Sequence, residues 1–161
     1  MALIFISIGS NVEREQHILN GVNALKLAFE NVVLSPVFES EAVGFNGDPF
    51  LNLAASAQTD KSIAEVVALL KQIEDSNGRV RKCEKFSSRT LDLDLLTYDQ
   101  LVVSEPVVLP RDEITKNAFV LWPLAELAPT EIHPTVLKTY QQMWNEYDKT
   151  QQKLHIVPFN F

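Results

Sequence analysis

The most informative segment of the chain is Ser88-Arg89-Thr90-Leu91-Asp92-Leu93-Asp94-Leu95-Leu96. Apolar and polar residues alternate along it, and side chains two residues apart on a β-strand point to the same face. The alternation predicts a strand that buries Leu91, Leu93 and Leu95 on one face. It places Asp92 and Asp94 together on the opposite face, where two like charges repel each other.

Two carboxylates on one strand face have two explanations. Hard cations such as Mg²⁺ take carboxylate oxygens together with substrate phosphates, so Asp92 and Asp94 are candidate metal ligands. The alternative is a half-exposed strand with a solvated acidic face. The strand alone leaves both explanations open.

The segment just upstream of this strand is basic. Residues 78–89 carry five cationic side chains and one acidic side chain, in a chain whose formal net charge is −7. Arginine forks bind phosphate oxygens through paired hydrogen bonds. A basic loop that leads into Asp92 and Asp94 therefore predicts a site where a metal holds a polyphosphate. The alternative is a solvated basic loop.

Two motifs give this region a resemblance to a known family. They are Gly78-Arg79-Val80-Arg81-Lys82 and Arg89-Thr90-Leu91-Asp92-Leu93-Asp94, which together resemble the signature of the 6-hydroxymethyl-7,8-dihydropterin pyrophosphokinases of folate biosynthesis. The resemblance covers nearly the whole chain. It extends to Ile8-Gly9-Ser10-Asn11, Phe50-Leu51-Asn52 and Phe119-Val120-Leu121-Trp122-Pro123-Leu124.

The resemblance implies an enzyme that transfers pyrophosphate from ATP to 6-hydroxymethyl-7,8-dihydropterin. The 6-hydroxymethyl oxygen would attack the β-phosphorus, AMP would leave, and two Mg²⁺ ions held by Asp92 and Asp94 would align the reactants. Two other functions remain open. One is a non-catalytic relative that binds pterin or nucleotide, and the other is a metal-dependent phosphotransferase with a different acceptor.

The resemblance also assigns residues to each part of the site. The catalytic residues would be Arg79, Arg89, Asp92 and Asp94. The pterin would be stacked between the rings of Phe50 and Phe119, and the Asn52 amide would form hydrogen bonds with the edge of the ring. Main-chain groups of Ser40, Val43 and Gly44 would make further contacts. The nucleotide would be bound by Glu74, Arg81, Lys82, Phe86, Leu95 and Arg111.

Some of these positions have simpler explanations or depart from the family. Glu74 is equally consistent with a solvated carboxylate on a helix. Arg111 follows Pro110 where the family often has histidine, Asn117 stands where relatives carry arginine, and Phe86 replaces a frequent tryptophan. All three departures lie on the nucleotide side of the expected site.

Composition limits the class of protein. A chain of 161 residues with 46% hydrophobic and 22% charged residues is typical of one soluble globular domain, here 1–161. The acidic balance argues against nucleic-acid binding, and no segment approaches the ~20 apolar residues of a membrane span. The single Cys83 fits a reducing cytoplasm. We expect a cytoplasmic monomer that acts on small molecules.

Periodicity predicts the order of the elements. Strands are expected at residues 3–9, 32–39, 51–59 and 90–98, with Gly9-Ser10-Asn11 as the turn after the first. Helices are expected up to about residue 29 and from Ser62, where Glu65 completes a capping box, to the Asn77-Gly78 stop. This βαββαβ order predicts an α+β, ferredoxin-like antiparallel sheet. Further helices are expected within 117–127 and around 137–147.

Overall fold

Most strands lie in the first two thirds of the chain, and three short helices follow them. The structure is a computed structural model that describes residues 1–40, 49–78, 90–150 and 152–161. Its elements are β1 (Ala2–Ser10), α1 (Arg14–Ala28), β2 (Glu30–Leu34), β3 (Val37–Ser40), β4 (Phe50–Thr59), α2 (Ile63–Ser76), β5 (Asp92–Tyr98), α3 (Glu113–Lys116), α4 (Ala118–Leu127), α5 (Tyr140–Glu146) and β6 (Leu154–Val157).

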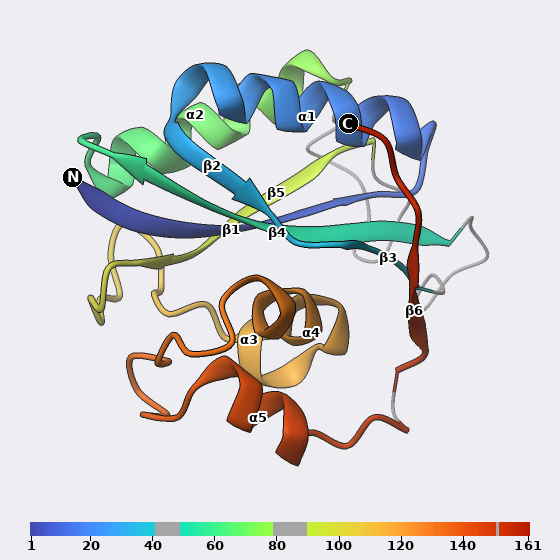
Figure 1. Ribbon diagram of the computed structural model, residues 1–161. Helices are drawn as coiled ribbons and strands as arrows, with labels where there is room; N and C mark the ends of the chain where they lie inside the picture. The colour runs from blue at the N-terminus through green and yellow to red at the C-terminus, as the bar shows by residue number, and fades with distance from the viewer. Residues whose placement is uncertain (41–48, 79–89, 151) are drawn as a thin grey trace.

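The strands form one antiparallel sheet in the order β5-β1-β4-β3-β6, and β2 also pairs with β4. The strand that follows α1 is therefore parallel to β1 with β4 between them, and β5 is parallel to β4 with β1 between them. This is the split βαβ arrangement of a ferredoxin-like sheet, so the predicted fold class is confirmed. Figure 1 shows α1 and α2 on one face of the sheet and α3, α4 and α5 on the other.

Alternation along the strands supplies the two faces with separate cores. Ile4, Ile6 and Ile8 of β1 pack with α1 and α2, whereas Phe5 packs with α4 and α5. The predicted face of Leu91, Leu93 and Leu95 is confirmed, since all three join the α1–α2 core. Within the described residues, no helix combines the length and hydropathy needed to cross a membrane.

The expected strand at 32–39 is wrong in one respect, because the structure divides it into β2 and β3. Pro36 has no N–H to donate to a neighbouring strand. At this break the Ser35 hydroxyl and main chain take over the pairing: Ser35 N donates to Ala54 O at 2.8 Å, and Ala54 N donates to Ser35 Oγ at 2.9 Å. Both halves still pair with β4.

The predicted strand at 3–9 is confirmed, but the prediction of a turn is wrong for Ser10, which continues β1 and pairs with Leu51 of β4. The last helix is shorter than expected: it starts at Tyr140 behind a capping box of Thr139 and Gln142, and Leu137 stays outside it, exposed. Neither α3 nor β6 was expected from the periodicity. The capping box and the C-terminal stop of α2 are confirmed.

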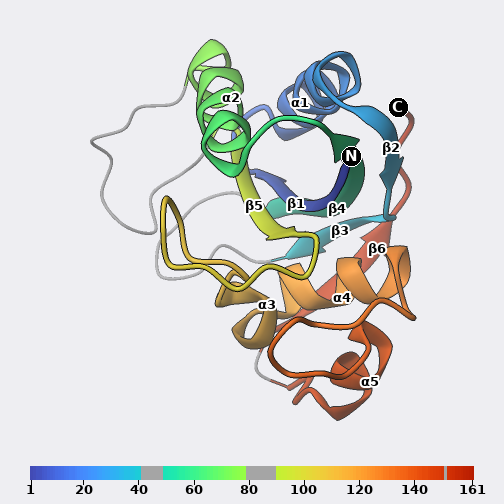
Figure 2. The ribbon, with the colours of Figure 1, turned by 90° about the vertical axis from the view of Figure 1, so that its left-hand side faces the viewer.

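The outer edge of β5 is closed by a side chain. In the sheet path β5 lies at one end and pairs with β1. On its other side Leu93 N donates to Glu74 Oε2 of α2 at 2.8 Å, and Glu74 is only 4% exposed. Of the two explanations given for Glu74, the solvated carboxylate on a helix is therefore wrong. Figure 2 shows α2 lying along this edge.

We expect Glu74→Leu to destabilise the protein by about 1–3 kcal/mol, because it leaves the buried Leu93 N–H without its acceptor. Glu74→Gln keeps an acceptor oxygen and removes the same charge, so the difference between the two variants isolates the hydrogen bond. Urea denaturation of both variants measures it. Equal free energies of unfolding would show that this bond does not stabilise the edge.

Candidate active site

Four residues on adjacent strands form one row across the sheet. Phe38 of β3 pairs with Asn52 of β4, Asn52 pairs with Gly9 of β1, and Gly9 pairs with Asp92 of β5. Cross-strand partners point to the same face, and Phe38 contacts Trp122 of α4. The row therefore faces α4. Asn52 and Asp92 lie two strand spacings apart, about 10 Å.

Gly9 gives the Asn52 amide its place in this row. A Cβ atom at Gly9 would lie 2.9 Å from Asn52 Oδ1, closer than a real Cβ contact allows. Asn52 Nδ2 donates to Ser40 Oγ at 2.9 Å, and both side chains are buried. The amide is thus held by Ser40 on one side and extends over the bare Gly9 backbone on the side of Asp92.

The aromatic residues expected to stack on a pterin border the same face. Phe50 pairs with Ser40 at the end of the β3–β4 ladder, so it alternates to the same face as Asn52. Phe119 of α4 is partly buried and packs against the core beneath that face. The structure therefore brings Phe50, Phe119, Asn52 and Ser40 to one side of the sheet.

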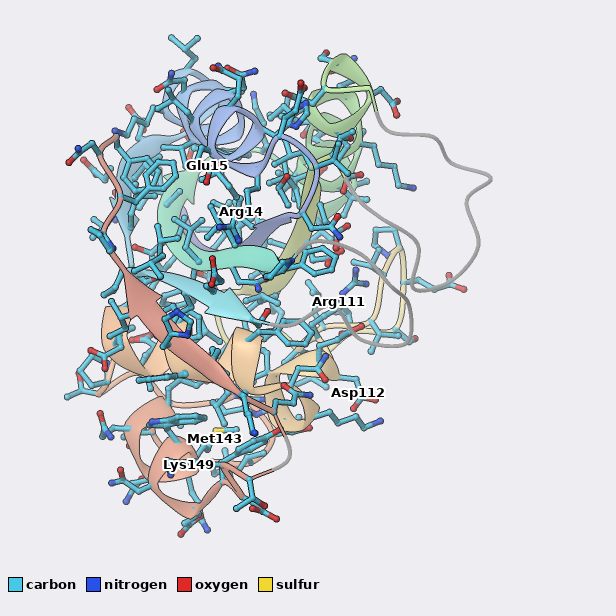
Figure 3. All side chains as sticks on the ribbon, turned by 90° about the vertical axis from the view of Figure 1, so that its right-hand side faces the viewer. Arg14, Glu15, Arg111, Asp112, Met143 and Lys149 are labelled. Carbon is cyan, nitrogen blue, oxygen red and sulfur yellow. The ribbon has the colours of Figure 1, made fainter. Side chains whose placement is uncertain are left out.

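The two aspartates lie on β5, beside a pocket of about 260 Å³. Asp94 Oδ1 accepts a hydrogen bond of 2.7 Å from Arg111 Nη2, and Arg111 N donates to Leu96 O at 2.9 Å. Figure 3 shows Arg111 on the same side of the molecule as Arg14. Apolar side chains, carboxylates and the cationic side chains of Lys71 and Arg111 line the pocket. The lining residues are Val67, Leu70, Lys71, Glu74, Asp92, Leu93, Asp94, Leu95, Val107 and Arg111.

The donor set beside this pocket fits Mg²⁺ held jointly with a phosphate ligand. In the parts of the chain that the structure describes, no three His, Cys, Asp or Glu side chains form a group that could hold a metal. Mg²⁺ commonly takes only one or two protein carboxylates and completes its shell with water and substrate phosphates. Two further polar atoms close to Asp92 and Asp94, Thr90 Oγ1 and Arg111 Nε, are buried without a hydrogen-bond partner among the described residues.

The pKa of the Asp94 carboxyl is raised from its usual 3.8 to about 6. Burial is the main cause, because it disfavours the charged form, and the carboxylate of Asp92 adds to it. The guanidinium of Arg111 acts in the opposite direction, while Glu74 adds further negative charge. A cation bound beside Asp94 would therefore offset the free-energy cost of its buried negative charge.

Several predicted site residues lie outside the described residues, namely Val43, Gly44, Arg79, Arg81, Lys82, Phe86 and Arg89. Leu95 is buried in the α1–α2 core and also lines the pocket. Sequence reasoning missed the contact of Arg111 with Asp94, which joins residues 17 positions apart, and the role of Gly9. A glycine inside an apolar strand was the available signal for a close approach at that point.

We expect the metal-free protein to lose stability as the pH rises from about 4 to about 6. The raised pKa means that the folded state binds a proton at Asp94 that the unfolded state releases near its usual 3.8, so ionising the folded carboxyl weakens folding. Asp94→Asn should reduce this decline. Urea denaturation in the presence of a chelator, at several pH values, measures it; an identical pH dependence in both proteins would contradict the assignment.

Known proteins resemble this chain over most of its length. The family model of 7,8-dihydro-6-hydroxymethylpterin-pyrophosphokinase (HPPK) matches residues 5–129. The 2-amino-4-hydroxy-6-hydroxymethyldihydropteridine pyrophosphokinase of Aquifex aeolicus is 32% identical over 145 residues, which are 88% of this chain and 90% of the relative. The enzyme of the same name from Bacillus subtilis is 29% identical over 162 residues, covering 95% of this chain and 96% of the relative.

Solved structures show the same fold. HPPK-DHPS of Plasmodium falciparum with STZ-DHP superposes with a TM-score of 0.72 at 10% identity, over 91% of this chain. The chain spans 43% of that longer chain, and the low identity limits this likeness to the fold. The match of the family model together with the similarity to the Aquifex aeolicus enzyme shows that the chain belongs to the 7,8-dihydro-6-hydroxymethylpterin-pyrophosphokinase family.

Proposed function

We propose that this protein transfers a pyrophosphoryl group from ATP to 6-hydroxymethyl-7,8-dihydropterin, giving the pterin diphosphate and AMP in folate biosynthesis. The observation that carries the proposal is the row of Asn52, Gly9 and Asp92 across three strands, in a chain of this family. The row places a hydrogen-bonding amide and a carboxylate on one sheet face, about 10 Å apart. A planar bicyclic substrate can lie between them.

The pterin half of the site works by stacking and edge recognition. The Asn52 amide offers both a donor and an acceptor, which suits the amino-oxo edge of the ring, and its bond to Ser40 fixes its orientation. Phe50 and Phe119 supply aromatic faces for the planar heterocycle. Main-chain groups of Ser40, Val43 and Gly44 complete the contacts.

The nucleotide half of the site depends on charge. Asp92 and Asp94 are the residues that would hold Mg²⁺, two ions by the family resemblance, and the bound metal would supply neutralisation of the phosphate charge during an in-line attack on the β-phosphorus. Arg79 and Arg89 bind the triphosphate at its reacting end. Arg81, Lys82 and Phe86 of the basic loop supply further nucleotide contacts. Glu74 of α2, Leu95 of β5 and Arg111, which precedes α3, supply the rest.

Arg111 balances the charge of Asp94 when no cation is bound. Its Nη2 lies 2.7 Å from Asp94 Oδ1, and the pair is only partly exposed. This pair also favours a second candidate function, a relative that binds pterin or nucleotide without catalysis. The Arg111 guanidinium already pairs with Asp94, one of the two expected metal ligands. Release of AMP from ATP in the presence of the reduced pterin and Mg²⁺ separates the two functions.

The same assay tests the choice of acceptor. Turnover with other hydroxyl compounds, and none with the pterin, would indicate a different phosphotransferase. We further propose that the chain acts as a single domain and a monomer in the cytoplasm, on small molecules, without nucleic acid or membrane. The ordinary globular composition supports the single domain, and the acidic net charge of −7 supports the absence of nucleic-acid binding.

Asp94→Ala should lower turnover by roughly 10²–10³, the usual loss when one electrostatic contact to the transition state is removed. Pterin affinity should change much less. Asp112→Ala is the matched control, because Asp112 is an exposed carboxylate that pairs with Lys116. Steady-state rates at saturating Mg²⁺ decide; near-normal turnover of Asp94→Ala would contradict the metal assignment.

Gly9→Ala should weaken pterin binding roughly tenfold or more and leave ATP binding unchanged, because the added Cβ displaces the Asn52 amide and an unpaired polar edge is costly. Asn52→Ala should cause a similar loss. In the double variant the two losses should not add, since no amide remains to be displaced. Titration of each ligand measures this, and additive losses would show that Gly9 acts independently of Asn52.

A further inference from the structure

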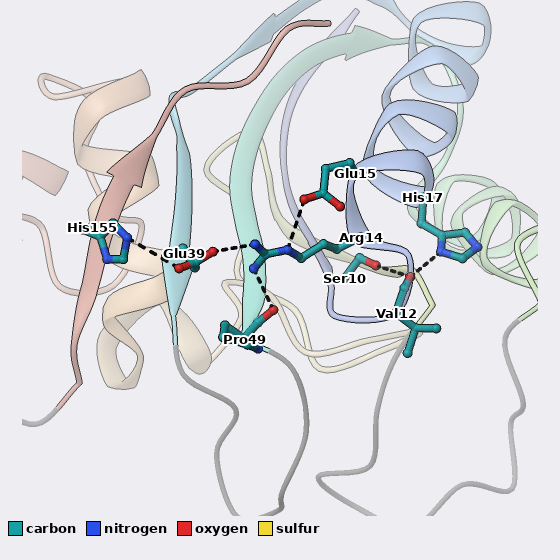
Figure 4. A network of polar contacts seen from close by, with 8 residues as sticks. All are labelled: Ser10, Val12, Arg14, Glu15, His17, Glu39, Pro49 and His155. Atoms are coloured by element: carbon teal, nitrogen blue, oxygen red, sulfur yellow. Dashed lines mark hydrogen bonds and ion pairs between the residues drawn. The ribbon is translucent and has the colours of Figure 1, made fainter.

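One arginine outside the proposed site contacts β3 and the residue just before β4, the two strands that carry Ser40, Phe50 and Asn52. Arg14 is the first residue of α1. Its Nη2 lies 2.6 Å from Glu39 Oε2 of β3, and its Nη1 donates to the carbonyl oxygen of Pro49 at 3.0 Å. Figure 4 shows the guanidinium between these two groups, with Glu15 on its Nε. The planar fork of arginine suits such a two-sided contact.

The two partners of Arg14 immediately precede pterin residues. Glu39 precedes Ser40, and Pro49 precedes Phe50, while Ser40 and Phe50 are themselves the last pair of the β3–β4 ladder. Beyond that pair no further ladder bond joins the two strands among the described residues. Arg14 therefore fastens the strands together at the point where the main-chain pairing ends.

Arg14 acts from the opposite face of the sheet. Glu39 alternates with Phe38 and Ser40 along β3, so its side chain points toward the face covered by α1. Its ladder partner Leu51 belongs to the α1–α2 core on that face. Arg14 is thus placed behind the strands and does not touch the pterin face. Its effect on a ligand is exerted through the position of Ser40 and Phe50.

The C-terminal strand supports the same contact. Glu39 pairs with His155 of β6 in the sheet, and His155 Nε2 lies 3.6 Å from the second carboxylate oxygen of Glu39. The Glu39 carboxylate is accordingly held between two elements from opposite ends of the chain. Its side chain is 26% exposed and that of Arg14 is 24% exposed, so water screens this pair less than an ion pair on an open surface.

We propose that Arg14 is a positioning residue for the pterin: it sets the separation of Ser40 and Phe50 by joining Glu39 to the Pro49 carbonyl. The inference rests on the proposed function for the identity of the ligand. It adds a requirement for substrate binding that lies in α1, away from the residues that contact either substrate.

Arg14→Ala should raise the dissociation constant for the reduced pterin about tenfold, as expected for loss of a charge-assisted contact. Affinity for a non-hydrolysable ATP analogue with Mg²⁺ should stay within about twofold, and KM for the pterin should rise more than kcat falls. Arg14→Gln retains a donor for the Pro49 carbonyl and should lose less. Lys138→Ala, which breaks the exposed Lys138–Glu146 pair near α5, is the matched control and should change neither affinity.

A charge exchange makes the test specific. Glu39→Arg alone should weaken pterin binding, and the double variant Arg14→Glu with Glu39→Arg should recover part of the affinity. Unchanged pterin affinity in both Arg14 variants would overturn the proposal, as would a parallel loss of ATP-analogue affinity and thermal stability. If the wild-type protein forms no pterin diphosphate, the proposed function is refuted but the Arg14 proposal is not. The pterin titrations test the role of Arg14 independently of turnover.

Discussion

The register of β1 between β4 and β5 is the constraint on which the site depends. Antiparallel pairing sets Gly9 opposite both Asn52 and Asp92. Because side chains alternate with a period of two, a slip of one residue in either ladder would turn one of these groups toward α1 and α2. The apolar face prevents this, since such a slip would also turn the leucines of β4 or β5 away from the α1–α2 core. Core packing thus fixes the position of polar groups that contribute nothing to the core.

The same arrangement concentrates negative charge at the β5 edge. Asp92, Asp94 and Glu74 lie around one pocket, and the raised pKa of Asp94 records first the cost of burying its charge and then the repulsion from Asp92 and Glu74. Arg111 reduces that cost, and so does the bond from Leu93 N to Glu74. A folded protein that keeps such a cluster gives up stability for a site that attracts cations. The charges therefore have a functional explanation that burial alone does not provide.

Much of this architecture followed from local patterns. Alternation of leucine and aspartate identified β5 and its buried face, and capping residues located both ends of α2. The failures involve tertiary contacts. Pro36 divided one expected strand into two, and Ser10, expected in a turn, continues β1 and pairs with Leu51 of β4. The pairing of Asp94 with Arg111 depends on a chain reversal that no short motif encodes. The family resemblance supplied the chemical roles, which periodicity does not contain.

The helical layer below the sheet explains how the ligand face keeps its shape. Phe38, at one end of the cross-strand row, lies 4.7 Å between ring centroids from Trp122, which stacks on Trp144 at 5.1 Å with an interplanar angle of 11°. Phe119 precedes Trp122 by one turn of α4, so both project from neighbouring positions on that helix. The aromatic stack anchors α4 to β3, and thereby places Phe119 on the face of β4 that carries Asn52 and Phe50. Packing between α4 and α5 is in this way connected to the geometry of the face proposed to bind the pterin.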